Sequence, residues 1–290
     1  MYQLFTKCVL FNLKLYIMQS METVKAYAKV NLTLDVLKKR GDGYHDLRSI
    51  MHCIDLYEAV TLEPADTISV SCDVPLPENS ATYRAARAYM ALTGFGAHIG
   101  IKKFIPDEAG LGAASANAAA VFLGMQKLYG ALSEERVYAL AAMIGADVPF
   151  CMMQGCALAE GIGEKLTPLK RIPLDLLIVK SAKGISTKTL FSSLTLPVKH
   201  PNTHAALRAV ERGDVHALAK HMHNALEECA CAFVPEIRAL KERLLKAGAL
   251  GATMTGSGSA VVGVFESAVE ARRAAKEFAD CEFVRVCRTI

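Results

Sequence analysis

One short segment constrains the fold of this 290-residue chain more than any other. It runs from Pro106 to Asn117 and combines two glycines with small and polar side chains. A strand-like stretch, 97–105, precedes it, and an alanine-rich run predicts a helix over 114–128. Glycine lets backbone approach a bulky ligand, and a helix start offers unpaired N–H groups and the positive end of a dipole. The segment therefore predicts a strand, a tight loop and a helix that bind a phosphorylated molecule.

The glycine loop fits neither of two common nucleotide-binding motifs. It lacks the lysine and hydroxyl residue of G-x-x-x-x-G-K-[ST]. Ala114 and Ser115 occupy the stretch where a dinucleotide fingerprint needs its third glycine. The alternative is a strand-to-helix turn that needs small residues for packing alone. Ser115 and Asn117 favour ligand binding, because both are poor residues inside a helix but can hold phosphate oxygens or a metal.

Composition and charge narrow the class of protein. Hydrophobic residues make up 52% and charged residues 21%, so the chain can bury the core of two domains or one large one. The net charge of +4 comes without a basic block, which argues against a nucleic-acid binder and suits a small anionic substrate. Nine cysteines without a C-x-x-C pair predict free thiols and a reducing cytoplasm. Residues 1–20 read as neither signal peptide nor membrane span, so we expect the functional start at Met21.

Hydrophobic periodicity predicts strands and helices in mixed order. We expect strands over 24–37, 47–56, 59–63, 67–72, 97–105, 174–180, 251–254, 260–265 and 282–288. We expect helices over 81–92, 114–128, 134–144 and 268–278, and a mainly helical region over 186–246. Asn79 and Ser133 are the expected helix N-caps, and 145–150 is expected to lead directly into a strand. A domain boundary is expected near 170–185, with a second glycine-rich loop, 255–259, beyond it.

Lys29 and Asp147 are candidates for a catalytic pair. Lys29 lies in an alternating strand, where a solvent-facing side chain is the simpler interpretation. Asp147 lies in an apolar setting, where a turn or capping aspartate is the simpler interpretation. If the two act together, the carboxylate accepts or orients a hydroxyl proton, while the ammonium keeps it ionised and stabilises phosphoryl charge.

Two histidine-containing segments are candidate binding sites. Tyr44 and His45 follow a turn, and an aromatic ring beside an imidazole suits a nucleobase, although a hairpin flank is the alternative. A second group consists of His216, His221, His223, Cys229 and Cys231. Its spacing matches no standard zinc pattern, so it predicts a solvated helix face.

Several segments, in order along the chain, resemble the GHMP kinase superfamily and, within it, the 4-diphosphocytidyl-2-C-methyl-D-erythritol kinases. They are Ala28–Leu32, Arg40–His45, Ala109–Ala119, Gly145–Phe150, Ala159–Glu164 and Met254–Ser259. The G-x-G-Y-H and G-A-D-V-P-F pieces are specific, whereas the glycine loops alone indicate the superfamily. The resemblance implies an α+β, two-domain GHMP kinase fold. It comprises a ribosomal protein S5 domain 2-like domain over 21–175, which binds ATP, and a ferredoxin-like domain over 176–290, with 1–20 as an extension.

The resemblance also implies a reaction and its site. ATP would phosphorylate the 2-hydroxyl of 4-diphosphocytidyl-2-C-methyl-D-erythritol, with Asp147 as general base, Lys29 as its partner and His45 reading the cytosine. The implied substrate-binding residues are Asn31, Tyr44, His45, Thr187, Phe191, Gly256 and Gly258. The implied ATP-binding residues are Pro106, Ala109, Gly110, Leu111, Gly112, Ala113, Ala114, Ser115 and Asn117. Mg²⁺ is the implied metal, with Ser115 as a ligand, and the implied partners are small molecules rather than nucleic acid or membrane.

Three alanines depart from the family pattern G-L-G-G-G-S-S-N. They are Ala113, Ala114 and Ala116, in place of two glycines and one serine. Alanine allows helical dihedrals but is disfavoured at positive φ, so either these positions are helical or the loop is altered. Two other functions therefore remain: another GHMP kinase of the homoserine or mevalonate type, and a catalytically silent GHMP-fold binding protein. Tyr44 and His45 argue against the first, and only the alanines support the second.

Overall fold

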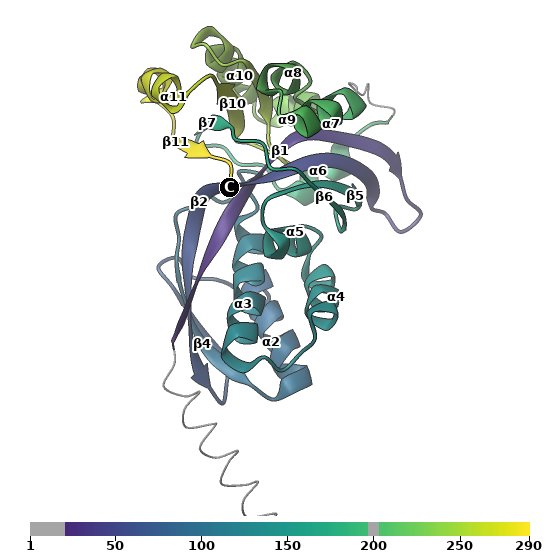
Figure 1. Ribbon diagram of the computed structural model, residues 1–290, viewed down its shortest axis with the longest axis vertical. Helices are drawn as coiled ribbons and strands as arrows, with labels where there is room; N and C mark the ends of the chain where they lie inside the picture. Colours follow the sequence, from purple (N-terminus) through teal and green to yellow (C-terminus); the bar gives the residue numbers. More distant parts are fainter. Residues whose placement is uncertain (1–20, 197–202) are drawn as a thin grey trace, which may run out of the picture. The chain divides into compact units, whose positions relative to one another are not determined.

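The computed structural model describes residues 21–196 and 203–290, which divide into two compact units (Figure 1). The first unit comprises residues up to Ala26 together with Tyr57–Phe104 and Ala114–Met152. The second comprises Tyr27–Leu56, Ile105–Ala113 and Met153–Ile290. The expected extension over 1–20 lies outside the described residues, and the expected domain boundary at residue 175 stays a prediction.

The first unit is built from strands of the seven-stranded sheet and from the helices that lie beside them (Figure 1). Its strands are the second half of β2 (His45–Ala65), β3 (Ser69–Cys72) and β4 (Gly96–Lys102). β4 runs antiparallel to β2 and parallel to β3. The helices are α2 (Ala81–Thr93), α3 (Ala113–Tyr129), α4 (Glu134–Ile144) and α5 (Val148–Met153). Helix α3 packs closely on β2, because a Cβ at Gly124 would fall 2.3 Å from the Leu62 side chain.

The helix ends confirm one predicted cap and correct another. The Ser133 side chain accepts a hydrogen bond from the Arg136 N–H at the start of α4, as expected. The prediction for Asn79 is wrong, because Ser80 occupies the N-cap position of α2 and makes no side-chain cap. Helix α3 begins at Ala113, so the alanines that replace the family's glycines lie in helical backbone. Helical dihedrals suit alanine, and the glycine loop is therefore not strained by these replacements.

Strand β1 (Glu22–Lys39) is a single long strand with an unusual second half. Side chains alternate between the two faces of a strand, so Ala28, Val30 and Leu32 share one face, in a hydrophobic core. The opposite face carries polar residues, and these are buried as well: Lys29, Asn31, Thr33 and Asp35. A buried polar face must be hydrogen-bonded, so this face of β1 is where function is expected.

A four-stranded antiparallel sheet forms the C-terminal part of the second unit. Its order is β11 (Phe283–Arg288), β7 (Asp175–Lys180), β10 (Val261–Phe265) and β9 (Gly251–Met254). Helices α10 (Glu236–Lys246) and α11 (Ala268–Ala275), the latter continued by a 3₁₀ turn at Lys276–Phe278, pack against it (Figure 1). Apolar residues of the sheet and of both helices share one core, as the alternating and helical patterns predicted.

The remaining elements of the second unit are short. They are the sheet strands β5 (Cys156–Gly161), β6 (Lys165–Leu169) and β8 (His223–Asn224), and the helices α6 (Thr187–Ser193), α7 (Thr203–Arg212), α8 (Val215–Lys220) and α9 (Glu227–Phe233). β5 pairs with the first half of β2, and β8 pairs in parallel with β1. Strand β8 was not predicted, because two residues carry no periodic signal.

Two further predictions from periodicity need correction. Residues 47–56 and 59–63 were expected as separate strands but belong to the continuous strand β2. Residues 145–150 were expected to lead into a strand, yet helix α5 (Val148–Met153) comes first. Pro149 is tolerated there because the first helical turn needs no N–H donor from it.

Candidate active site

The polar face of β1 organises the candidate site in the second unit. The Lys29 Nζ donates to Asn31 Oδ1 at 2.7 Å, and Asn31 Nδ2 donates to Ser49 Oγ at 2.7 Å. Lys29 and Asn31 are each only 4% exposed. The interpretation of Lys29 as a solvent-facing residue is therefore wrong. An ammonium held in a buried, hydrogen-bonded position is preorganised to stabilise negative charge.

The first glycine loop, which we define as 106–112, packs directly on Lys29. The Leu111 carbonyl accepts a hydrogen bond from the Lys29 N–H at 3.0 Å. Gly112 has φ +75°, and a Cβ on it would lie 3.0 Å from Lys29 Cγ, so glycine suits both the backbone conformation and the tight contact there. Pro106 is half-buried and Ala109 is buried at the loop's start. The predicted ATP loop and the predicted catalytic lysine are thus in contact.

The second glycine loop, 255–259, closes around the same lysine. Thr255 Oγ1 accepts from the Asn31 N–H at 2.9 Å. The N–H groups of Ser259 and Ala260 donate to carbonyls of the first loop. Gly256 has φ +54°, and a Cβ on it would lie 3.0 Å from Lys29 Nζ. The structure therefore brings both glycine loops, Asn31 and Lys29 together within one unit.

Helix α6 links this cluster to the residues predicted to hold a nucleobase. Thr187 Oγ1 and Ser257 Oγ are 2.8 Å apart, which joins α6 to the second glycine loop. Phe191 lies four residues on, on the same side of the helix. Its ring centroid is 5.3 Å from that of His45. Tyr44, the residue before His45, is 60% exposed, and its place among the substrate-binding residues stays a prediction.

Burial, with a smaller contribution from the nearby charge of Lys39, lowers the pKa of His45. A lowered pKa favours the neutral imidazole. A neutral ring has one donor and one acceptor nitrogen, which is what the edge of a nucleobase requires. His45 and Phe191 thus supply a hydrogen-bonding ring and an apolar ring side by side.

The first unit holds the remaining predicted residues. Asn117 is buried in α3, and its Nδ2 donates to Glu58 Oε2 at 2.6 Å. The other oxygen, Glu58 Oε1, accepts from the Phe104 N–H at 3.2 Å. Because Glu58 accepts both bonds, the amide orientation of Asn117 is fixed, and its buried Oδ1 is left without a hydrogen-bond partner. Asn117 therefore presents an acceptor, a group suited to a donor or a metal rather than to a phosphate oxygen.

No sequence motif predicted Glu58 as a site residue. The signal was present, because Glu58 falls on the buried face of β2 with Leu56 and Val60 and is itself fully buried. An acid at an apolar position of an alternating strand needs a partner or a task.

Asp147 lies directly before α5 in the first unit and is half-buried. The segment that leads to it lies beside the start of α3. A Cβ placed on Gly145, two residues before Asp147, would lie 4.0 Å from Ser115 Oγ. The structure thus places the predicted metal ligand close to the segment that carries the predicted base.

The histidine and cysteine group does not lie on one solvated helix face, because His223 and Cys231 are buried. The expectation of a solvated helix face is wrong for His223. This residue is buried in β8, where its Nε2 is 2.5 Å from Asp35 Oδ1. Thr203 Oγ1 donates to the other Asp35 oxygen. Within 21–196 and 203–290, no three His, Cys, Asp or Glu side chains are grouped to bind a metal. The eight cysteines of these ranges are free thiols.

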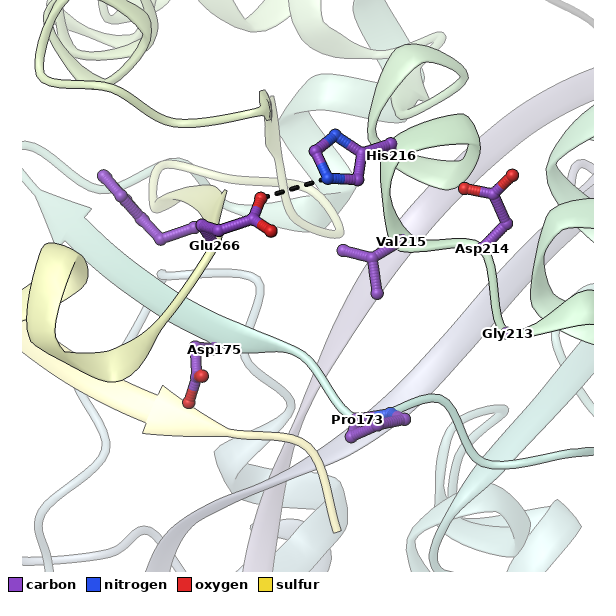
Figure 2. Close-up of a pocket in the computed structure, with 8 residues that line it drawn as sticks. Pro173, Asp175, Gly213, Asp214, Val215, His216 and Glu266 are labelled. Carbon is purple, nitrogen blue, oxygen red and sulfur yellow. Dashed lines mark ion pairs between the residues drawn. The ribbon is translucent and has the colours of Figure 1, made fainter.

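A cavity of about 310 Å³ opens elsewhere in the second unit (Figure 2). Acidic side chains line it, and His216 Nε2 is 3.1 Å from Glu266 Oε2. None of the predicted site residues belongs to its lining. The cavity and the cluster of Lys29 with the two glycine loops therefore share no residue. Among the described residues, no helix combines the length and apolar character needed to span a bilayer.

Both the sequence and the fold of this chain are similar to those of known kinases. A family profile described as GHMP kinases N terminal domain matches residues 80–155, and one described as GHMP kinases C terminal matches residues 206–282. The structure of a homoserine kinase from Cytophaga hutchinsonii shares the fold, with a TM-score of 0.74 at 19% identity over 94% of this chain and 96% of that one. Fold and glycine loops together define a small-molecule kinase of the GHMP class.

More similar relatives narrow the class. The 4-diphosphocytidyl-2-C-methyl-D-erythritol kinase of Caldicellulosiruptor saccharolyticus is 43% identical, over 87% of this chain and 91% of that protein. The corresponding kinase of Carboxydothermus hydrogenoformans is 41% identical, over 85% and 89%. A crystal structure of 4-(cytidine 5'-diphospho)-2C-methyl-D-erythritol kinase has a TM-score of 0.81 at 33% identity, covering 92% of this chain and 99% of that one. The chain belongs to the 4-diphosphocytidyl-2-C-methyl-D-erythritol kinase family.

Proposed function

We propose that the chain transfers the γ-phosphoryl group of ATP to the 2-hydroxyl of 4-diphosphocytidyl-2-C-methyl-D-erythritol, in the non-mevalonate synthesis of isoprenoid precursors. The observation that carries this is the buried Lys29, enclosed by two glycine loops and hydrogen-bonded to Asn31. Phosphoryl transfer depends chiefly on positioning and charge stabilisation, and a fixed ammonium beside open backbone supplies both.

Two residues carry the chemistry in this proposal. Asp147 accepts the proton of the attacking hydroxyl as general base. Lys29 stabilises the charge that develops on the transferred phosphoryl group. Asn31 holds the Lys29 ammonium in place through the bond from Nζ to Oδ1.

The first glycine loop and the start of α3 are proposed to bind ATP. Gly110, Leu111 and Gly112 bring backbone against the phosphates, and the N-terminal end of the 17-residue helix α3 favours their negative charge. The half-buried Ser115 hydroxyl is an oxygen ligand of the kind Mg²⁺ accepts when phosphates and water supply the others. When bound, Mg²⁺ would neutralise phosphate charge as the transfer proceeds.

The cytidine end of the substrate is proposed to bind at His45 and Phe191. A neutral imidazole reads the cytosine edge, and the Phe191 ring packs beside it. Thr187, joined to Ser257, lies between this pair and the glycine loops along α6. We further propose that the enzyme works in the cytoplasm, which the eight free cysteines of the described residues support.

The test is ATP-dependent release of ADP in the presence of separate alcohol acceptors. We expect release with 4-diphosphocytidyl-2-C-methyl-D-erythritol and background rates with mevalonate and with homoserine. Turnover of mevalonate or homoserine in preference would identify another GHMP kinase. No turnover of any acceptor, with ATP bound, would leave a silent binding protein.

A further inference from the structure

Asn224, in the two-residue strand β8, holds the second glycine loop with both hydrogens of its amide. Its Nδ2 lies 2.8 Å from the Met254 carbonyl oxygen and 2.8 Å from that of Gly256. Its Oδ1 accepts from the Leu226 N–H at 2.9 Å. The reversed amide would set an oxygen against two carbonyls, so this orientation is fixed. Asn224 is 8% exposed, and every hydrogen-bonding group of its amide is used.

The two carbonyls belong to the residues before and after Thr255. Thr255 is connected to the catalytic lysine through Asn31. Thr255 Oγ1 accepts from the Asn31 N–H, and Asn31 Oδ1 accepts from Lys29 Nζ. Holding these two carbonyls therefore holds the Thr255 hydroxyl that accepts the Asn31 N–H. The contacts form one chain from Asn224 through Thr255 and Asn31 to Lys29.

The backbone of Asn224 is tied to the same strand as the lysine. Asn224 is paired with Leu34 of β1, and the next N–H, that of Ala225, donates to the Leu34 carbonyl at 2.8 Å. Asn224 therefore connects β1, through its backbone pairing, to the second glycine loop, through its side-chain amide. A glycine-rich loop has much backbone freedom, and such a loop needs an external hold to keep a defined position.

We propose that Asn224 is a positioning residue for phosphoryl transfer: its amide fixes the second glycine loop relative to β1 and so sets the position of Lys29. This inference rests on the proposed function for its catalytic part. Asn224 touches neither substrate nor nucleotide in this account and acts through Thr255 and Asn31. It lies outside every motif through which the sequence indicated function.

Two variants test the amide. Asn224→Asp keeps the shape of the side chain but cannot donate to either carbonyl when ionised. Asn224→Ala removes both donors without introducing charge, so it decides the matter if the aspartate variant does not fold. We expect kcat to fall about tenfold to a hundredfold in each, because small displacements of catalytic groups cost rates of that order. The KM values for ATP and for the acceptor should change little, because the binding groups themselves remain.

Glu227→Gln is the matched control. Glu227 Oε2 accepts from the Met254 N–H and from Thr253 Oγ1, so it supports the end of β9 but not the two loop carbonyls. We expect this variant to lower the urea midpoint of unfolding as the Asn224 variants do, while kcat stays near that of the parent. An equal fall of kcat in the control would show that Asn224 affects kcat only through the stability of the fold. That result would overturn the proposal.

Hydrogen exchange gives a readout that does not need activity. Amides of residues 254–259 should exchange faster in Asn224→Ala than in the parent, with β7 and β10 unchanged. Unchanged exchange would refute the hold on the loop, and faster exchange with full kcat would refute its catalytic relevance. If the parent transfers phosphate to no acceptor, the proposed function fails, and the exchange comparison alone decides whether the amide fixes the loop.

Discussion

Replacing Gly110 with alanine tests how closely the two glycine loops approach one another. Gly110 has φ +71°, and a Cβ built on it would fall 2.0 Å from the Thr255 carbonyl oxygen and 2.9 Å from Gly258 N. The same carbonyl accepts the Gly258 N–H at 2.9 Å. The added methyl group must therefore push the second loop away, and the turn from Thr255 to Gly258 must open.

The magnitude follows from separating two costs. Alanine at positive φ costs about 1–2 kcal/mol relative to glycine. Forcing a side chain into occupied space adds about 1–3 kcal/mol. The total for Gly110→Ala is then about 2–5 kcal/mol of unfolding free energy. A loop displaced by about 1 Å should also lower kcat about a hundredfold.

Gly213→Ala is the control for the backbone term. Gly213 has φ +68°, nearly that of Gly110, but no atom lies within 4 Å of its added Cβ. Urea unfolding should therefore show about 1–2 kcal/mol for Gly213→Ala, with kcat unchanged, and the excess in Gly110→Ala reports the clash. Equal destabilisation by the two variants, or full activity of Gly110→Ala, would refute the close contact of the loops.

Three further outcomes are expected. Asp147→Asn should lower kcat about a hundredfold or more while nucleotide affinity, measured by titration calorimetry, is retained; near-parental turnover would remove it as the base. Burial lowers the pKa of His52 to about 4. As pH falls, the unfolded chain therefore binds a proton at this residue before the folded chain does. The free energy of unfolding should fall by about 3 kcal/mol between pH 6.5 and pH 4. Urea unfolding of His52→Gln should lose that part of the slope, and an unaltered slope would contradict the assignment. Glu58→Gln leaves either Asn117 or Phe104 without its acceptor and should cost about 1–3 kcal/mol, whereas the exposed Glu63→Gln should cost nothing measurable in the same assay.

Much of the fold was predictable because local patterns and packing agree. The alternation in β1, the capping Ser133 and the glycine at the end of α2 all predicted elements that the structure contains. Predictions failed where the structure did not follow the local residue preference, or where an element was too short to show periodicity. Asn79 is a good capping residue, but Ser80 occupies the N-cap position of α2, which begins at Ala81 as expected.

The site was less accessible to pattern alone. Alternation placed Lys29 on the polar face of β1, and a polar face normally meets water. Tertiary structure covers that face, and only the partners of Lys29 reveal it as a site. Glu58 and Asn224 escaped notice for a related reason, because their roles depend on groups more than twenty residues away in the sequence. The motif resemblance supplied roles for residues such as His45 and Phe191, whose pairing no spacing rule predicts.

Lys29 provides the most direct test of the account, because both glycine loops and Asn31 are arranged around it. The measurement is the rate at which Lys29→Met forms phosphorylated 4-diphosphocytidyl-2-C-methyl-D-erythritol, followed by ³¹P NMR with both substrates saturating. The account predicts a fall of about a hundredfold to a thousandfold, because a fixed charge that stabilises the transferred group is lost. A Lys29→Met enzyme that forms product at nearly the parental rate would contradict it.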